Sequence, residues 1–185
     1  KRMFHHVRSL YRDGQPHYIA INTYDQMRKA RREQWTADRV GRLVTEKQLE
    51  TERLDFKQTL GNDSTTKKPW AAMANSGGGD VIYGVAEVDS KADHIERITF
   101  DGIEERIQQL NQAIDPPVNL AVSQIPVDGD DGGVVCVRVS PAAPGTVHMV
   151  DHRTPIRSGT TTRYMTSEEI RRWIREAKRP STPEL

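Results

Sequence analysis

The pattern of hydrophobic and polar positions along the chain predicts an α+β domain. Apolar runs at 118–125 and 134–139 are typical of strands, and the Asp- and Gly-rich stretch 128–133 between them predicts a hairpin turn. The run Val-Ile-Tyr-Gly-Val at 81–85 indicates a further, buried strand. We therefore expect a mixed or antiparallel sheet flanked by helices.

Two helices are predicted inside this domain. Pro69 suits a first helical position, so a short helix is expected from Pro69 to Asn75, after a polar loop at 64–68. A second helix is expected between a cap at Asp101 and a stop at Asp115-Pro-Pro. Its apolar positions recur at intervals of three and four residues: Ile103, Ile107, Leu110 and Ile114.

The two ends of the chain differ from its middle. Residues 1–20 look irregular, and 24–44 have the composition of a helix with an apolar seam beside a basic face. Thr166-Ser-Glu-Glu169 is a capping box that predicts a last helix, and 180–185 read as a disordered tail. This last helix is expected to bury Ile170, Trp173, Ile174 and Ala177. The resulting domain boundaries are 1–44 for a basic extension, 45–179 for the domain and 180–185 for the tail.

Composition narrows the class of protein. A length of 185 residues suffices for one domain with one core, plus an extension, and the mean hydropathy of -0.72 indicates many polar faces. No apolar run is long enough to predict a transmembrane helix or a signal peptide. The single cysteine, Cys136, predicts a reduced core thiol and a cytoplasmic protein. Because the first residue is Lys rather than Met, we expect the chain to be part of a longer protein.

The net charge of +1 hides a segregation of charge along the chain. Residues 1–45 hold ten Lys or Arg against four acids, 46–152 hold nine against eighteen, and 153–185 hold eight against four. Basic ends around an acidic middle would suit a nucleic-acid backbone bound about a metal-binding centre. The alternative is that the basic ends are simply solvated.

The stretch Glu50-Thr-Glu-Arg-Leu-Asp55-Phe-Lys57 carries the candidate chemistry. If 55–57 is a strand, its period of two places Asp55 and Lys57 on one face. A carboxylate beside an ammonium group can hold a hard cation and steady a phosphate or an attacking water. An isolated triplet of this kind is more commonly a surface salt bridge, so the argument depends on the segments that follow.

Other familiar kinds of site are not predicted. Glycines 77–79 follow a predicted helix and precede a strand, the reverse of the order in a phosphate-binding loop, so they indicate helix closure and no nucleotide cofactor. The six histidines lack the spacing of a structural zinc site. His148 and His152 flank a predicted turn, where a solvated role is favoured over that of a general base.

Several segments together resemble one family. The acid pair Glu50 and Asp55 is separated by four residues and followed by Phe-Lys, then by Ala74-Asn-Ser-Gly-Gly and a strand that ends in Gly84-Val85. Asp115-Pro-Pro, the strand at 134–139 and Pro155-Ile-Arg-Ser-Gly159 follow in the same order. Over about 45–165 the chain resembles the Schlafen core, also called the AlbA-type nucleic-acid-binding domain.

This resemblance implies a metal-dependent endoribonuclease acting on structured RNA such as tRNA. Carried onto this chain, Glu50, Asp55 and Glu87 would hold Mg or Mn, and Lys57 would steady the scissile phosphate. Two positions depart from the family pattern, since Asp55 stands where Glu is usual and Ala86-Glu87 where Asp-Asp is usual. The alternative is a non-catalytic DNA- or RNA-binding module of a bacterial regulator, in which the acids are structural.

Basic side chains provide the candidate nucleic-acid contacts. Arg157 begins a run rich in hydroxyl groups, in which Tyr164 could stack a base. An amphipathic extension cannot bury its apolar face alone, so we also expect a homodimer in which the extensions build one basic groove. The full set of expected contacts is Arg28, Lys29, Arg32, Arg138, Arg157, Arg163 and Tyr164.

Overall fold

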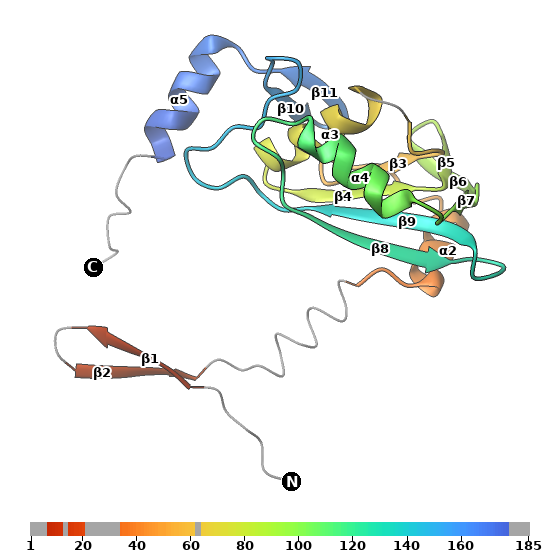
Figure 1. Cartoon of the computed structure of the whole chain (residues 1–185), viewed down its shortest axis with the longest axis horizontal. Helices are drawn as coiled ribbons and strands as arrows, with labels where there is room; N and C mark the ends of the chain where they lie inside the picture. The colour runs from red at the N-terminus through yellow and green to blue at the C-terminus, as the bar shows by residue number, and fades with distance from the viewer. Residues whose placement is uncertain (1–6, 13–14, 21–33, 62–63, 178–185) are drawn as a thin grey trace, which may run out of the picture. The chain divides into compact units, whose positions relative to one another are not determined.

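The computed structural model describes residues 7–12, 15–20, 34–61 and 64–177 (Figure 1). By the contacts that its residues make, the chain divides into two compact units, Lys1–Trp35 and Thr36–Leu185. In the first unit, β1 (Val7–Arg12) and β2 (Gln15–Ala20) pair as antiparallel strands. The prediction of irregular structure over 1–20 is therefore wrong for these two segments.

Within the described residues, the helix expected over 24–44 begins at Ala37. Residues 21–33 lie outside the described part of the chain, and α2 spans Ala37–Thr45. Thr36 caps it, because the Thr36 side chain accepts a hydrogen bond of 3.3 Å from the backbone N–H of Arg39. Helix α2 belongs to the larger unit, so the division between the units falls nine residues before the predicted boundary at 44.

One mixed sheet forms the centre of the larger unit. β3 (Leu54–Lys57) pairs in parallel with β4 (Gly79–Tyr83), and β4 pairs antiparallel with β9 (Gly132–Val139). β9 is also bound antiparallel by β8 (Leu120–Pro126) and by the short β7 (Ile98–Thr99). The two predicted strands at 118–125 and 134–139 thus form the expected hairpin.

Two smaller antiparallel pairs accompany this sheet. β5 (Val85–Val88) pairs with β6 (Lys91–Ile95), directly after β4. β10 (Pro155–Ser158) pairs with β11 (Thr161–Tyr164), and Figure 1 shows this hairpin beside the helix that follows β3.

The helix between β3 and β4, α3, spans Ser64–Asn75. It begins five residues before Pro69, so the prediction of a loop at 64–68 is wrong and Pro69 lies inside the helix. The glycines close it as predicted. Gly77 and Gly78 have φ values of 93° and 83°, and the N–H of Gly78 donates to the carbonyl of Met73 at 2.8 Å.

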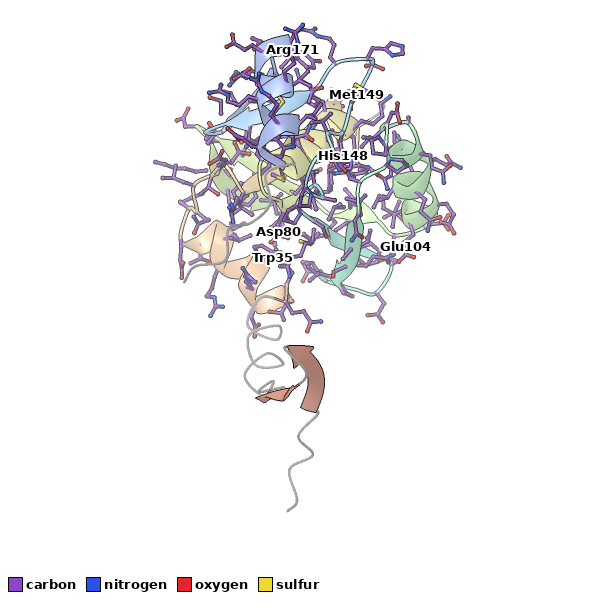
Figure 2. All side chains as sticks on the ribbon, turned by 90° about the vertical axis from the view of Figure 1, so that its left-hand side faces the viewer. Trp35, Asp80, Glu104, His148, Met149 and Arg171 are labelled. Carbon is purple, nitrogen blue, oxygen red and sulfur yellow. The ribbon has the colours of Figure 1, made fainter. Side chains whose placement is uncertain are left out.

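The next helix, α4, spans Ile103–Gln112 and packs its apolar positions on the sheet as predicted. Its cap is Gly102, in a left-handed conformation with φ of 64°, and not Asp101. In Figure 2 Glu104 lies at one side of the domain, where it accepts a hydrogen bond of 3.0 Å from Gln124 of β8. The largest buried side chains of the core shared by α3, α4 and the sheet are Trp70, Met73, Tyr83, Ile107 and Ile114.

The last helix, α5, spans Ser167–Ala177 and has the predicted capping box. The backbone N–H of Glu169 donates to the Thr166 hydroxyl at 3.2 Å, and the N–H of Thr166 donates to the Glu169 carboxylate at 2.8 Å. Its apolar side is only half-buried at Ile170, Trp173 and Ile174, which corrects the expectation of a buried face. The side chain of Ala177 and the tail at 180–185 lie outside the described residues.

The fold class is the predicted one, an α+β domain with a mixed sheet and helices beside it. Cys136 is a free thiol, buried on β9 as expected. Among the described residues, no helix has the length and apolar character needed to cross a membrane.

Candidate functional site

A tight turn brings the two acids of the Glu50–Lys57 segment together. Thr51 and Leu54 exchange backbone hydrogen bonds of 2.9 and 3.4 Å across Glu52 and Arg53, so the chain folds back on itself. Glu50 Oε1 consequently accepts the backbone N–H of Phe56 at 2.9 Å. The four residues that separate the two acids, 51–54, are therefore the ones that form this turn.

Lys57 lies beside both acids, and its closeness to Asp55 is the one that the period of two predicts. Lys57 Nζ is 3.1 Å from Asp55 Oδ1 and 3.9 Å from Glu50 Oε1, and it donates to the carbonyl of Phe56 at 2.8 Å. Asp55 and Glu50 are buried, whereas the Lys57 side chain is 35% exposed. The acids thus fix an ammonium group that still reaches solvent.

Arg157 belongs to the same cluster, which sequence reasoning had placed on a separate substrate-binding loop. Its Nη1 lies 3.8 Å from Asp55 Oδ1, and its Nη2 donates to the carbonyl of Thr51 at 3.2 Å. The guanidinium is 3% exposed, so it is enclosed by the protein. We call Glu50, Asp55, Lys57 and Arg157 the acid–base cluster.

Asn75 and Ser76 position Arg157, a role that the sequence pattern alone did not reveal. The Asn75 amide donates to the carbonyls of His148 and Pro155 at 2.9 and 2.8 Å and accepts the N–H of His148 at 2.8 Å. The Ser76 hydroxyl accepts the N–H of Arg157 at 2.9 Å. The Ala-Asn-Ser segment belongs to the family pattern and so marks these residues as candidates. It does not predict their partners, which are more than seventy positions away in the sequence.

Burial controls protonation in the acid–base cluster. Desolvation, followed by a hydrogen bond to Asp55, raises the pKa of Glu50 to about 8. Asp55 Oδ2 is buried and has no hydrogen-bond partner when both carboxyl groups are ionised. A proton on Glu50 can supply that missing donor.

Glu87 does not join this pair. It is an exposed residue of β5, and within the described ranges no three His, Cys, Asp or Glu side chains are grouped so that they could hold a metal ion. The predicted convergence of Glu50, Asp55 and Glu87 is therefore wrong. The strand that carries Glu87, β5, pairs with β6.

Arg138 lies on the opposite face of the sheet from Asp55. In the register of β3, β4 and β9, Asp55 shares a face with Val81, whereas Arg138 shares the other face with Asp80. The Arg138 guanidinium binds both carboxylate oxygens of Asp80, at 2.8 and 3.1 Å. Arg138 thus lies apart from the acid–base cluster.

The other expected nucleic-acid contacts in the described chain also have partners within the protein. Arg163 binds the Glu169 carboxylate through two hydrogen bonds of 2.9 and 2.7 Å. This pairing holds the pKa of Arg163 above its usual value. The ring of Tyr164 is covered by the guanidinium of Arg153, 3.5 Å from the ring centre. Arg28, Lys29 and Arg32 lie outside the described residues.

The domain is thus of the α+β class, with a parallel β3–α3–β4 unit and paired acids just before β3 and within it. A model of the Schlafen, AlbA_2 family matches residues 50–166. This is more than half of the chain, so the chain belongs to that family. Membership associates it with nucleic-acid-related function, and the matched range contains the whole acid–base cluster.

The comparison with solved structures supports the same fold. The crystal structure of the DIP2311 protein from Corynebacterium diphtheriae is similar, with 20% sequence identity and a TM-score of 0.50. The match covers 79% of this chain but only 29% of that chain. No curated protein matches.

Proposed function

We propose that the chain is a nucleic-acid-binding module, in which the acid–base cluster presents Lys57 to a backbone phosphate. One observation carries this proposal: the protein's own N–H and cationic groups already engage both acids. Phe56 N–H binds Glu50, and Lys57 lies 3.1 Å from Asp55. The acids therefore serve to orient cations, while no third acid accompanies them among the described residues.

Lys57 has the properties of a phosphate contact. Its ammonium group is fixed by Asp55 and by the carbonyl of Phe56, which lowers the entropy lost when it binds a ligand. About a third of the Lys57 side chain is exposed, so the ammonium N–H that binds neither Asp55 nor Phe56 can reach a phosphate oxygen. Such a contact is independent of sequence, so structured RNA such as tRNA and DNA are both within this class of ligand.

The test is binding of the protein to tRNA, messenger-like RNA and duplex DNA in EDTA over a range of salt concentrations. Lys57→Gln should reduce the salt slope by about 0.7 on single strands or about 0.9 on duplexes, which is one phosphate contact. Lys91→Gln removes an exposed charge on β6 and serves as the matched control. Wild-type protein that binds none of these nucleic acids would show the proposal to be wrong.

A specific observation supports a second candidate, a metal-dependent endoribonuclease. Asp55 Oδ2 is a buried carboxylate oxygen without a partner, next to the carboxyl group of Glu50. Mg²⁺ is commonly held by one or two carboxylates with water and substrate phosphates completing its shell, so Glu50 and Asp55 fit Mg or Mn as a two-carboxylate site. When bound, such an ion would activate water and stabilise charge on a phosphate.

In this second candidate the chain's own residues have distinct roles. Glu50 must lose its proton before it can bind a cation, and its raised pKa makes that step dependent on pH. Lys57 would hold the phosphate beside the acids, and Arg157 would keep Asp55 in place. Incubation with tRNA with and without Mn tests this candidate, since the wild-type protein should cleave only with Mn, and Glu50→Gln and Asp55→Asn should abolish that cleavage.

We further propose that the protein is a cytoplasmic homodimer whose residues 1–44 extend the binding surface. The two-stranded β1–β2 hairpin supports this, because an isolated hairpin is only marginally stable in water and gains stability from a packing partner. A mass in solution that stays monomeric at all concentrations would exclude the dimer. Deletion of 1–44 without loss of RNA affinity would exclude the contribution to binding.

A further inference from the structure

Two cations share the ring of Tyr164. The guanidinium carbon of Arg153 lies 3.5 Å from the ring centre, and Lys68 Nζ lies 4.7 Å from it. Both distances are within the range of a cation–π interaction, about 6 Å. Because both cations contact one ring, they are closer to each other than one Debye length, about 10 Å at 0.1 M salt, and repel each other.

Within the described part of the chain, no acid neutralises this pair of cations. Neither Lys68 nor Arg153 has a carboxylate within 4.0 Å among the described residues. The first turn of α3, four residues before Lys68, also carries no acid. Some exposed cations do have an acid partner, namely Lys47 with Asp93, Arg97 with Asp131 and Arg163 with Glu169. Lys68 and Arg153 are therefore a concentration of positive charge that an anion would stabilise.

The backbone positions of both residues are fixed before any ligand binds. Arg153 ends a tight turn in which Val150 and Arg153 exchange backbone hydrogen bonds of 2.9 and 3.0 Å. The two residues between them, Asp151 and His152, have φ values of 50° and 60°, as this type of turn requires. Lys68 is fixed at its backbone by α3. Preorganisation of this kind reduces the entropy lost on binding.

The register of the β10–β11 hairpin places this pair next to the acid–base cluster. Arg157 is opposite Thr162 and Tyr164 is opposite Pro155, so Arg157 and Tyr164 are diagonal neighbours on one face. Such neighbours are about 7–8 Å apart. Arg157 and Tyr164 thus share one face of this hairpin. Arg157 contacts Asp55, which binds Lys57, and Tyr164 contacts the two cations.

We propose that Lys68 and Arg153, supported by the ring of Tyr164, form a second phosphate-binding site. It takes a backbone phosphate of the same nucleic-acid strand, neighbouring the phosphate that Lys57 contacts. This assignment rests on the proposed function and adds a second contact point to it. It also gives Tyr164 a role as a platform for cations in place of the expected stacking of a base.

The experiment measures binding of a short single-stranded RNA oligonucleotide by fluorescence anisotropy in EDTA, over a range of KCl concentrations. Lys68→Gln and Arg153→Gln should each lower the salt slope by about 0.7, and the double variant by roughly twice that amount. Lys91→Gln, which removes one exposed charge from β6, should leave the slope unchanged. Arg153→Lys keeps the charge and should retain most of the slope, which separates lost charge from altered folding.

The outcomes distinguish this proposal from the one on which it rests. Slopes for Lys68→Gln and Arg153→Gln equal to that of Lys91→Gln, with Lys57→Gln still reduced, would overturn the second site alone. Absence of RNA binding by the wild-type protein would overturn both proposals. A reduced slope for Lys68→Gln and Arg153→Gln with an unchanged slope for Lys57→Gln would keep the second site as a phosphate contact and remove Lys57 from the interface.

Discussion

Asn75 binds both the N–H and the C=O of His148, a residue seventy-three positions later in the chain. Its amide also donates to the carbonyl of Pro155, the first residue of β10. One buried side chain at the end of α3 therefore holds the segment that delivers Arg157 to Asp55. A substitution at Asn75 should therefore lower the free energy of unfolding and also displace Arg157 from the acid–base cluster.

Replacement of Asn75 by Ala should destabilise the protein by at least about 2 kcal/mol, because it leaves buried backbone groups of His148 and Pro155 without partners. Ser76→Ala removes one hydrogen-bond acceptor and should cost only about 1 kcal/mol. Urea unfolding measures both values. Equal, small losses for the two variants would contradict the role of Asn75.

Arg157→Ala should lower stability more than it lowers the salt dependence of RNA binding. Arg157 is enclosed by the protein and balances Asp55, so its removal leaves a buried carboxylate with less compensation, at a cost of about 3 kcal/mol. Arg163→Ala breaks an exposed pair with Glu169, which solvent screens, and should cost less stability than Arg157→Ala. A double-mutant cycle with Asp55→Asn should show coupling between residues 55 and 157, and additivity there would argue against the ion pair.

The raised pKa of Glu50 predicts a specific loss of stability as the pH rises. The unfolded chain loses this proton near pH 4.5, whereas the folded protein keeps it to about pH 8. Between these values the folded state binds more protons, so stability from this group falls as pH increases. Glu50→Gln should flatten that part of the curve of unfolding free energy against pH, and the exposed Glu87→Gln should not.

Glu169 predicts the opposite dependence in acid. Its hydrogen bonds with the Arg163 side chain, and then with the N–H of Thr166, lower the pKa of Glu169 to about 2. The stabilisation is complete above about pH 4.5 and is lost as the pH falls toward 2. In the Glu169→Gln variant, the stability of α5 should depend less on pH in this range. Circular dichroism at a series of pH values measures this dependence. An unchanged acid transition would mean that the capping box contributes little.

Local sequence signals predicted those elements whose causes are local. The hairpin of β8 and β9 and the capping box at Thr166 each depend on residues a few positions apart. Pro69 predicts a helix start because proline suits a first helical position, whereas α3 begins at Ser64 and accommodates Pro69 in its interior. Asp101 was preferred to Gly102 for a similar reason, since the left-handed backbone at that position favours glycine.

The candidate site was only half predictable. The pairing of Asp55 with Lys57 follows from strand periodicity, and the closeness of Glu50 follows from the family pattern. The contact of Arg157 with Asp55 joins residues about a hundred positions apart and has no local signature. The family pattern predicts Glu87 as the third acid from its position after Gly84-Val85, but Glu87 is exposed on β5 and is not grouped with the other two acids as a metal site. The composition of the site therefore depends on contacts between residues far apart in the sequence, which local patterns do not predict.

The chain carries one cysteine, and its place on β9 makes it a built-in reporter of sheet opening. Burial raises the pKa of the Cys136 thiol, so the native protein should resist alkylation. Labelling then requires separation of β9 from its neighbours β4 and β8, on either side of it. The rate of alkylation at Cys136 would thus give the free energy of opening for the strand at the centre of the fold, without any engineered probe.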